Sequence, residues 1–325
     1  MLLNELLKTI PSDTEQRVNR ARERFNQNIR EALRQETGLR FRPRGRAGDL
    51  QASEFISIPV RLVAGLPMAL QRREIKEDQR VAALLAPWRR TLEQLLASGQ
   101  TASEKILALV DGLIEPNTER QYLQGSVRLA KFLLEQTQGF DLAAWILEVN
   151  KDVLGAYHFI FVTEPTLLPE PERQESHVEL YWGVIGLFSQ ILGLNPEALT
   201  IVVLAHELAH AYTHRAADID GKFWDSQGFG RTDLAVVEGL AQYYTARVCD
   251  RLMLSAPEAK GAYEELLKHQ PAAYQTHTPW LKKYKPEEVR FALVVARREG
   301  VMPIDGFESV LRAARSQLRW KEAEE

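Results

Sequence analysis

Three polar side chains interrupt an apolar stretch of the chain at residues 199–211. They are His206, Glu207 and His210, and almost every other residue of the stretch is aliphatic. A helix that is apolar on nearly every side lies at the centre of a domain, where an unpartnered polar group is costly. The stretch therefore predicts a buried central helix whose three polar groups share one chemical task.

The spacing of these residues indicates what that task is. His206 and His210 stand four residues apart, so both imidazoles lie on one helical face and can reach one Zn²⁺ ion at about 2.0–2.1 Å. Glu207 lies about 100° further round the helix, which directs its carboxylate at a water molecule beside the metal. This pattern predicts a zinc-dependent hydrolase with Glu207 as the catalytic base.

A third protein ligand is needed for a catalytic zinc site of this kind. Glu238 is the best candidate, because it is the only acid in the apolar run LAVVEGLAQYY, 28 residues after His210. A buried carboxylate needs a metal or a charged partner, so a salt bridge to an arginine is the alternative. The adjacent Gly239 would let the two ligand helices approach closely. Glu179 is the next-best ligand candidate.

The order of the motifs resembles a known group of enzymes. AHELAH followed by VVEGLAQYY is similar to the gluzincin metallopeptidases, and the layout around it resembles their small members, the minigluzincins. The resemblance covers residues 152–250, roughly. It implies His206, His210 and Glu238 as zinc ligands, Glu207 as the base, a zincin-like domain, and a peptide or protein substrate.

Further roles are implied by the same resemblance. Many gluzincins have an aspartate one turn after the glutamate ligand; here Gln242 stands there, an acceptor without charge. Tyr274 and His277 are the nearest residues that could stabilise the oxyanion. The strand expected at residues 177–182 would form the edge along which an extended peptide pairs.

The chain as a whole predicts an α+β fold that is predominantly helical. Residues 1–140 are expected to form a helical N-terminal accessory region, in which Ser12 and Glu15 make a capping box for a long helix. Residues 141–325 are expected to form the zincin-like domain with C-terminal helices. Strands are expected at residues 154–162 and 177–182. Helices are expected at residues 82–96, 102–114, 118–137, 184–192, 233–252 with Thr232 as the cap, 257–269, 285–299 and 305–318.

Charge and cysteine usage restrict the partners and the compartment. The net charge of −3 provides no general attraction to nucleic acid or to an anionic membrane, and no apolar run is long enough for a membrane helix. The single cysteine, Cys249, fits a reducing, cytoplasmic compartment. Ten arginines at residues 17–46 could contact nucleic acid or an acidic partner, but few aromatics are interleaved for base stacking, which favours a solvated helix with i,i+4 ion pairs.

Two other features near the central helix have simpler interpretations. His214 lies one turn beyond His210, where a histidine packs against neighbours or interacts with the helix dipole. Asp218, Asp220 and Asp225 resemble part of a calcium loop, but the remaining ligands are missing from the sequence, which favours a turn built by Asp and Gly.

Three functions are compatible with the sequence. The first is a zinc metallopeptidase. The second is a catalytically silent scaffold or regulatory protein that binds a partner through its arginine-rich N-terminal helices. The third is a zinc hydrolase that cleaves a bond other than a peptide bond, because activated water does not select amides alone.

Overall fold

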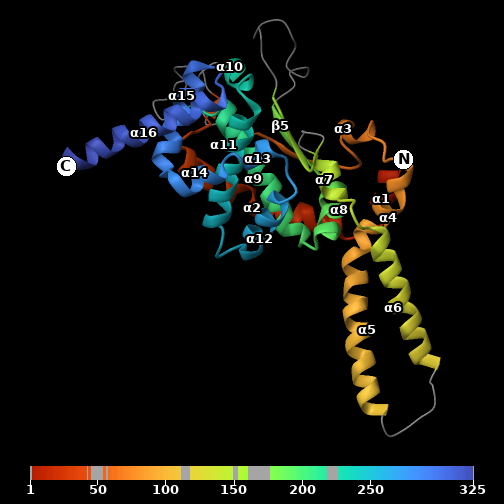
Figure 1. Cartoon of the computed structure of the whole chain (residues 1–325). Helices are drawn as coiled ribbons and strands as arrows, with labels where there is room; N and C mark the ends of the chain where they lie inside the picture. Colours follow the sequence, from red (N-terminus) through yellow and green to blue (C-terminus); the bar gives the residue numbers. More distant parts are fainter. Residues whose placement is uncertain are drawn as a thin grey trace, which may run out of the picture.

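The computed structural model confirms a predominantly helical α+β fold with a small three-stranded sheet (Figure 1). It describes residues 2–41, 43–44, 54–55, 58–110, 118–148, 153–159, 176–217 and 226–324. Asp218, Asp220 and Asp225 lie outside the described residues, as does the end of the strand predicted at residues 154–162. The division into an accessory region and a catalytic domain stays a prediction.

The central helix is α9, Pro196–Arg215, and it is buried along most of its length as predicted. Asn195 caps its start: the side chain of Asn195 accepts a hydrogen bond from the backbone N–H of Glu197 at 2.9 Å. Proline occupies the first helical position, where its missing N–H has no cost. The helices α2, Thr14–Thr37, and α11, Leu234–Arg251, both pack against α9.

An apolar stripe runs along α2. Val18, Phe25, Ile29 and Leu33 are all buried, and they belong to the same hydrophobic core as α9. Thus the N-terminal part of the chain contributes directly to the core that surrounds the central helix.

Two helix starts differ from the prediction by one residue. The capping box at Ser12 is absent, because the helix starts after Asp13, whose helical backbone angles (φ −86°, ψ −2°) do not suit side-chain capping. The cap predicted at Thr232 is instead Asp233, which accepts a hydrogen bond from the backbone of α11 at 3.0 Å. The hydroxyl of Thr232 donates to the carbonyl of Gly300, which accounts for the difference.

The three-stranded sheet has the order β3-β5-β4. Strand β5, His177–Tyr181, pairs in parallel with β3, Val60–Val63, and antiparallel with β4, Gly155–His158. The prediction that residues 177–182 form a substrate-binding edge is therefore wrong, because a strand on either side already pairs with β5. The two edges within the described sheet are β3 and β4.

The strand register places side chains on two distinct faces of the sheet. Residues directly opposite each other in an antiparallel pair share a face, and neighbours along a strand alternate. Gly155 pairs with the fully buried Leu180, and this face lies against α9. His158, His177 and Glu179 lie on the other face.

Helices α5, Arg89–Val110, and α6, Thr118–Gln136, form a hairpin that projects from the rest of the molecule (Figure 1). The prediction of separate helices at residues 82–96 and 102–114 is corrected: α5 continues through Gly99. One internal glycine costs only about 1 kcal/mol, and an added Cβ there would come within 2.1 Å of Val127. Gly99 therefore permits the close approach of the two hairpin helices.

The remaining elements complete the chain, and the predicted C-terminal helices are confirmed. None of the described helices combines the length and the apolar character that crossing a lipid bilayer requires. The elements are α1 Leu2–Leu7, β1 Pro43–Arg44, β2 Glu54–Phe55, α3 Met68–Gln71, η1 Glu77–Gln79, α4 Arg80–Leu85, η2 Ala86–Trp88, α7 Leu142–Leu147, α8 Trp182–Leu192, α10 Ser226–Gly230, α12 Pro257–Leu267, α13 Ala272–Gln275, α14 Thr278–Lys283, α15 Pro286–Glu299 and α16 Ile304–Glu324.

Candidate metal centre

Three ligand atoms from two helices converge at the centre of the molecule. The Nε2 atoms of His206 and His210 on α9 lie 3.1 Å apart, and each lies 3.3 Å from Oε2 of Glu238 on α11. A tetrahedral ion with bonds of about 2.0–2.1 Å holds its ligands about 3.3–3.4 Å apart. The three residues therefore have the spacing and the donor types of a group that can hold one metal ion.

The surroundings favour a positive ion at this point. All three side chains are buried, with exposed fractions of only 5–8%. Burial raises the pKa of Glu238, but the adjacent His210 and His206 outweigh this effect and hold the pKa well below its ordinary value. The ion-pair partners of Glu238 are thus the two imidazoles, which favours the metal interpretation over an arginine salt bridge.

Glu207 lies beside this group and is almost completely buried. Its neighbour is Gly155 on β4, where an added Cβ would come within 2.8 Å of both Glu207 Cγ and Val203 Cγ1. Glycine is thus required for β4 to approach the carboxylate this closely. Sequence reasoning did not identify Gly155, although a glycine inside a strand is a known sign of close backbone approach.

A small cavity of about 30 Å³ adjoins Glu207 and His206. Its lining also includes Gly155, Gln270 and Tyr274. A cavity of this size has room for one or two water molecules. The carboxylate of Glu207 therefore faces a space suited to water beside the metal-binding group.

The two candidates for oxyanion stabilisation occupy different places. Tyr274 lines the cavity, and its ring stacks on that of His206 with centroids 5.9 Å apart. His277 lies behind it, fully buried, and its Nδ1 donates to the carbonyl of Tyr274 at 2.9 Å while its Nε2 accepts from the hydroxyl of Tyr263. Burial lowers the pKa of His277 to about 4, so it is neutral at pH 7. Tyr274 thus lines the cavity and His277 does not, and the oxyanion role of either residue stays a prediction.

The contacts of two neighbours of Glu238 bear on the roles predicted for them. An added Cβ at Gly239 would come within 2.7 Å of Thr276 Oγ1 and 2.8 Å of Trp280, so the nearest neighbours that this glycine accommodates are Thr276 and α14. The amide nitrogen of Gln242 donates to Gln270 at 3.0 Å. The role of Gln242 as an acceptor for a ligand histidine stays a prediction.

His214 packs among aromatic rings one turn beyond His210. Its ring centroid lies 5.2 Å from that of Phe229 and 5.5 Å from that of Phe159. Burial, together with the nearby His210 and Arg297, lowers the pKa of His214 to about 3. A neutral histidine interacts little with the helix dipole, so the packing interpretation is the one that fits.

Two other sequence candidates lie apart from the metal-binding group. Cys249 is buried, and burial raises the pKa of its thiol to about 12, which agrees with a packing role. Glu179, the second candidate for the third ligand, lies with His158 and His177 on the sheet and not with His206 and His210.

No protein-family model matches the chain, and no curated protein or solved structure matches it either. The resemblance to gluzincins therefore rests on the motif residues alone.

Proposed function

We propose that the chain is a zinc-dependent metallopeptidase. The observation that carries the proposal is the convergence of two imidazoles and one carboxylate at 3.1–3.3 Å, with the buried carboxylate of Glu207 next to them. Zinc suits this donor set, because nitrogen and carboxylate ligands from three side chains leave one position open for chemistry.

The roles of the side chains follow from their positions. A bound zinc ion supplies a Lewis acid that makes water a better nucleophile and polarises a carbonyl group. Glu207 accepts a proton from water in the adjoining cavity and passes it to the leaving amine. Tyr274, which lines the cavity beside His206, would donate a hydrogen bond to the oxygen on which negative charge develops.

A peptide substrate is supported by the position of β4. Within the described sheet, β4 pairs with β5 alone, so its other edge can accept an extended chain. Gly155 on this strand touches Glu207, which would bring a paired peptide next to the catalytic carboxylate. Recognition through the backbone would give little selection among substrate side chains.

We expect a movement of the chain to accompany substrate binding. The cavity of about 30 Å³ has no room for a peptide, and Gln270, Pro271 and Tyr274 form part of its lining. We therefore expect the segment around α13 to move away from α9 before a substrate binds. Such segments commonly close again over a bound substrate and exclude water.

The test combines metal analysis with a single variant, Glu207→Gln. Elemental analysis of the purified chain is expected to find zinc in both proteins, because Glu207 is not a ligand. Hydrolysis of a fluorogenic peptide library is expected to fall by about 10²–10⁴-fold in the variant. Unchanged hydrolysis by the variant would defeat the assignment of the base.

The same assay separates the alternatives. A scaffold or regulatory protein would bind zinc but would hydrolyse neither peptides nor activated esters. A zinc hydrolase of another kind would cleave esters in a Glu207-dependent way and leave every peptide intact. Either result would contradict the peptidase proposal.

A further inference from the structure

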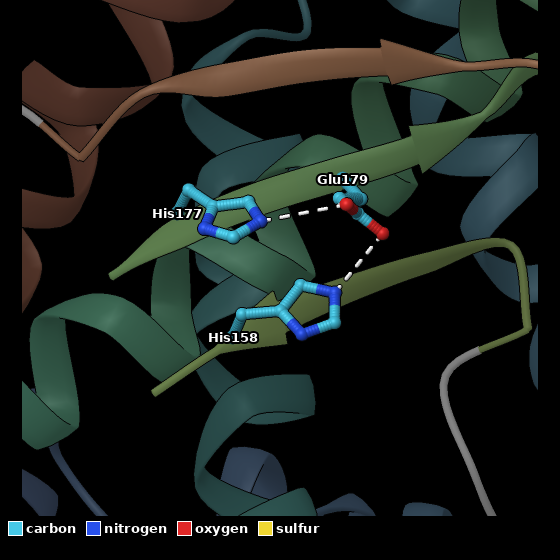
Figure 2. A group of neighbouring side chains, drawn as sticks. All are labelled: His158, His177 and Glu179. Carbon is cyan, nitrogen blue, oxygen red and sulfur yellow. Dashed lines mark hydrogen bonds and ion pairs between the residues drawn. The ribbon is translucent and has the colours of Figure 1, made fainter. Parts of the chain in front are cut away.

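A second group of metal-binding side chains lies on the face of the sheet opposite to α9. His177 and Glu179 come from β5, and His158 comes from the adjacent β4 (Figure 2). One ligand atom from each residue lies within 4.8 Å of the others. None of the three belongs to the metal centre described above, so a metal site here does not depend on the proposed peptidase activity.

Both imidazoles point at the same carboxylate, as Figure 2 shows. Nε2 of His158 lies 3.0 Å from Oε2 of Glu179, and Nε2 of His177 lies 3.4 Å from Oε1. These separations bracket the distance of about 3.3–3.4 Å between ligands of a tetrahedral zinc ion. The two imidazole rings stack with centroids 4.7 Å apart.

The strand register fixes this arrangement. His158 pairs directly with His177, and Ala156 pairs with Glu179. Because the alanine side chain is small, it occupies little of the space beside the carboxylate. Tyr181, two residues further along β5 on the same face, donates a hydrogen bond from its hydroxyl to Oε2 of Glu179 at 2.7 Å. Such a bond orients a ligating carboxylate, and its loss commonly weakens metal binding.

We propose that His158, His177 and Glu179 form a second binding site for a divalent transition ion of the zinc class. Two imidazoles and one carboxylate are donors that Zn²⁺, Ni²⁺ and Cu²⁺ prefer, whereas Mg²⁺ and Ca²⁺ prefer sites made of oxygen alone. An ion here would lie between the two imidazoles and the carboxylate of Glu179. It also joins β4 to β5 through side chains as well as through backbone hydrogen bonds.

The two sites differ in their exposure to solvent. The side chains of His158, His177 and Glu179 are 43%, 14% and 22% exposed. The corresponding values at the central group are 5–8%. We therefore expect the sheet site to bind its ion more weakly and to exchange it faster than the central site.

The site is tested by zinc stoichiometry on the full chain, stripped of metal and freed of any affinity tag. Calorimetric titration with ZnCl₂ is expected to find two ions per chain, one bound more weakly. His158→Gln is expected to weaken the second ion at least tenfold and to leave the first unchanged; its side chain is exposed enough for the fold to tolerate the change. Glu238→Gln is expected to remove the first ion and keep the second.

A matched control and two further variants sharpen the result. His269→Gln changes a histidine that also contacts a carboxylate, that of Asp141, but lies in neither group, so two ions should remain. His177→Gln should act like His158→Gln. Tyr181→Phe keeps all three ligands and should weaken the second ion by about 10–100-fold, as expected for a group that orients a ligand.

Amide hydrogen exchange shows where in the chain the second ion binds. In the Glu238→Gln chain, zinc should slow amide exchange in β4 and β5, and the additional change His158→Gln should abolish that protection. Failure of the Glu238→Gln chain to bind any zinc at saturation would overturn the proposal. So would a second ion whose affinity is the same in His158→Gln and His177→Gln.

Discussion

The backbone of Gly155 on β4 lies directly against the side chain of Glu207 on α9. A Cβ atom at position 155 would come within 2.8 Å of Glu207 Cγ and 3.0 Å of Glu207 Oε1. Real Cβ atoms are almost never this close to a neighbour, so any larger residue must displace either the strand or the carboxylate. The contact couples an edge of the sheet to the proposed catalytic base.

Gly155→Ala is accordingly expected to reduce peptide hydrolysis by tenfold or more. Displacements of about 1 Å in a catalytic group can cost about 10²-fold in rate. The overpacked site should also lose about 1–3 kcal/mol of unfolding free energy. Kinetic assays and urea unfolding of the same preparation measure both effects.

Gly125→Ala in α6 is the matched control. No atom lies within 4 Å of an added Cβ there, and alanine favours a helix over glycine by about 1 kcal/mol. This variant should keep full activity and gain a little stability. Wild-type activity in Gly155→Ala would contradict the close contact between β4 and Glu207.

The central site should link metal binding to stability through Glu238. Zinc at a hundred times its dissociation constant adds about 2.7 kcal/mol to the free energy of unfolding. A chelator should therefore lower the stability of the chain, and Glu238→Gln should abolish most of this effect. Both measurements use a His158→Gln background, so that only the central site contributes.

Glu265→Gln provides the control for the loss of a carboxylate. Glu265 forms an ion pair with Lys268 on the surface of α12 and lies outside both metal-binding groups. The chelator effect should stay at its full size in this variant. An equal chelator effect in Glu238→Gln would show that Glu238 is not a ligand.

Part of this architecture could be predicted from the sequence because its signals are local. The apolar run around His206 and His210 specifies a buried helix, and the Asn195-Pro196 pair marks its start. Glu238 could be identified because a single acid inside an apolar helix needs a partner. Each of these inferences uses residues within a few helical turns of each other.

The sheet could not be predicted in the same way. Strand β3 lies more than a hundred residues before β5 in the sequence, and no local pattern shows that the two strands pair. Without knowledge of β3, the sequence predicts an edge position for residues 177–182. The pairing of His158 with His177 and the contact of Gly155 with Glu207 depend on strand register, so both appear only in the structure.

His277 should make the protein less stable as the pH falls. Its pKa in the folded state is lowered to about 4 by burial, whereas an unfolded histidine has a pKa of about 6.5. Between these values the unfolded chain binds a proton that the folded chain does not, so the unfolding free energy decreases as pH falls from 6.5 to 4. One pKa unit corresponds to about 1.4 kcal/mol, giving a loss of roughly 3 kcal/mol.

His277→Gln removes this contribution to the pH dependence. Unfolding free energies of the two metal-free proteins are compared at pH 7 and pH 4.5. The variant should be less stable at pH 7, because the bonds to Tyr274 and Tyr263 are lost. The difference between the proteins should narrow at pH 4.5. A difference that is constant with pH would show that His277 titrates normally.

His269 should show the opposite dependence on pH. It bonds Asp141 at 2.8 Å; this bond raises the pKa of His269 and lowers that of Asp141. The contribution of His269 to stability is complete at pH values below its unfolded pKa of about 6.5. It is lost as pH rises through the higher pKa of the folded state. The contribution of Asp141 to stability is complete above its unfolded pKa of about 3.9. It is lost as pH falls through the lower pKa of the folded state. The pair therefore stabilises the fold most between about pH 4 and 6.5.

The magnitude of this effect is limited by solvent, because the side chain of Asp141 is 49% exposed. A pair this exposed contributes less than about 1 kcal/mol. His269→Gln should therefore cost stability at pH 6, and the cost should shrink by pH 9, as measured by urea unfolding of the metal-free proteins. Because His277→Gln has its larger cost at the higher pH, the two variants measured together distinguish a buried neutral histidine from a charged one. A cost of His269→Gln that grows with pH would contradict the ion pair with Asp141.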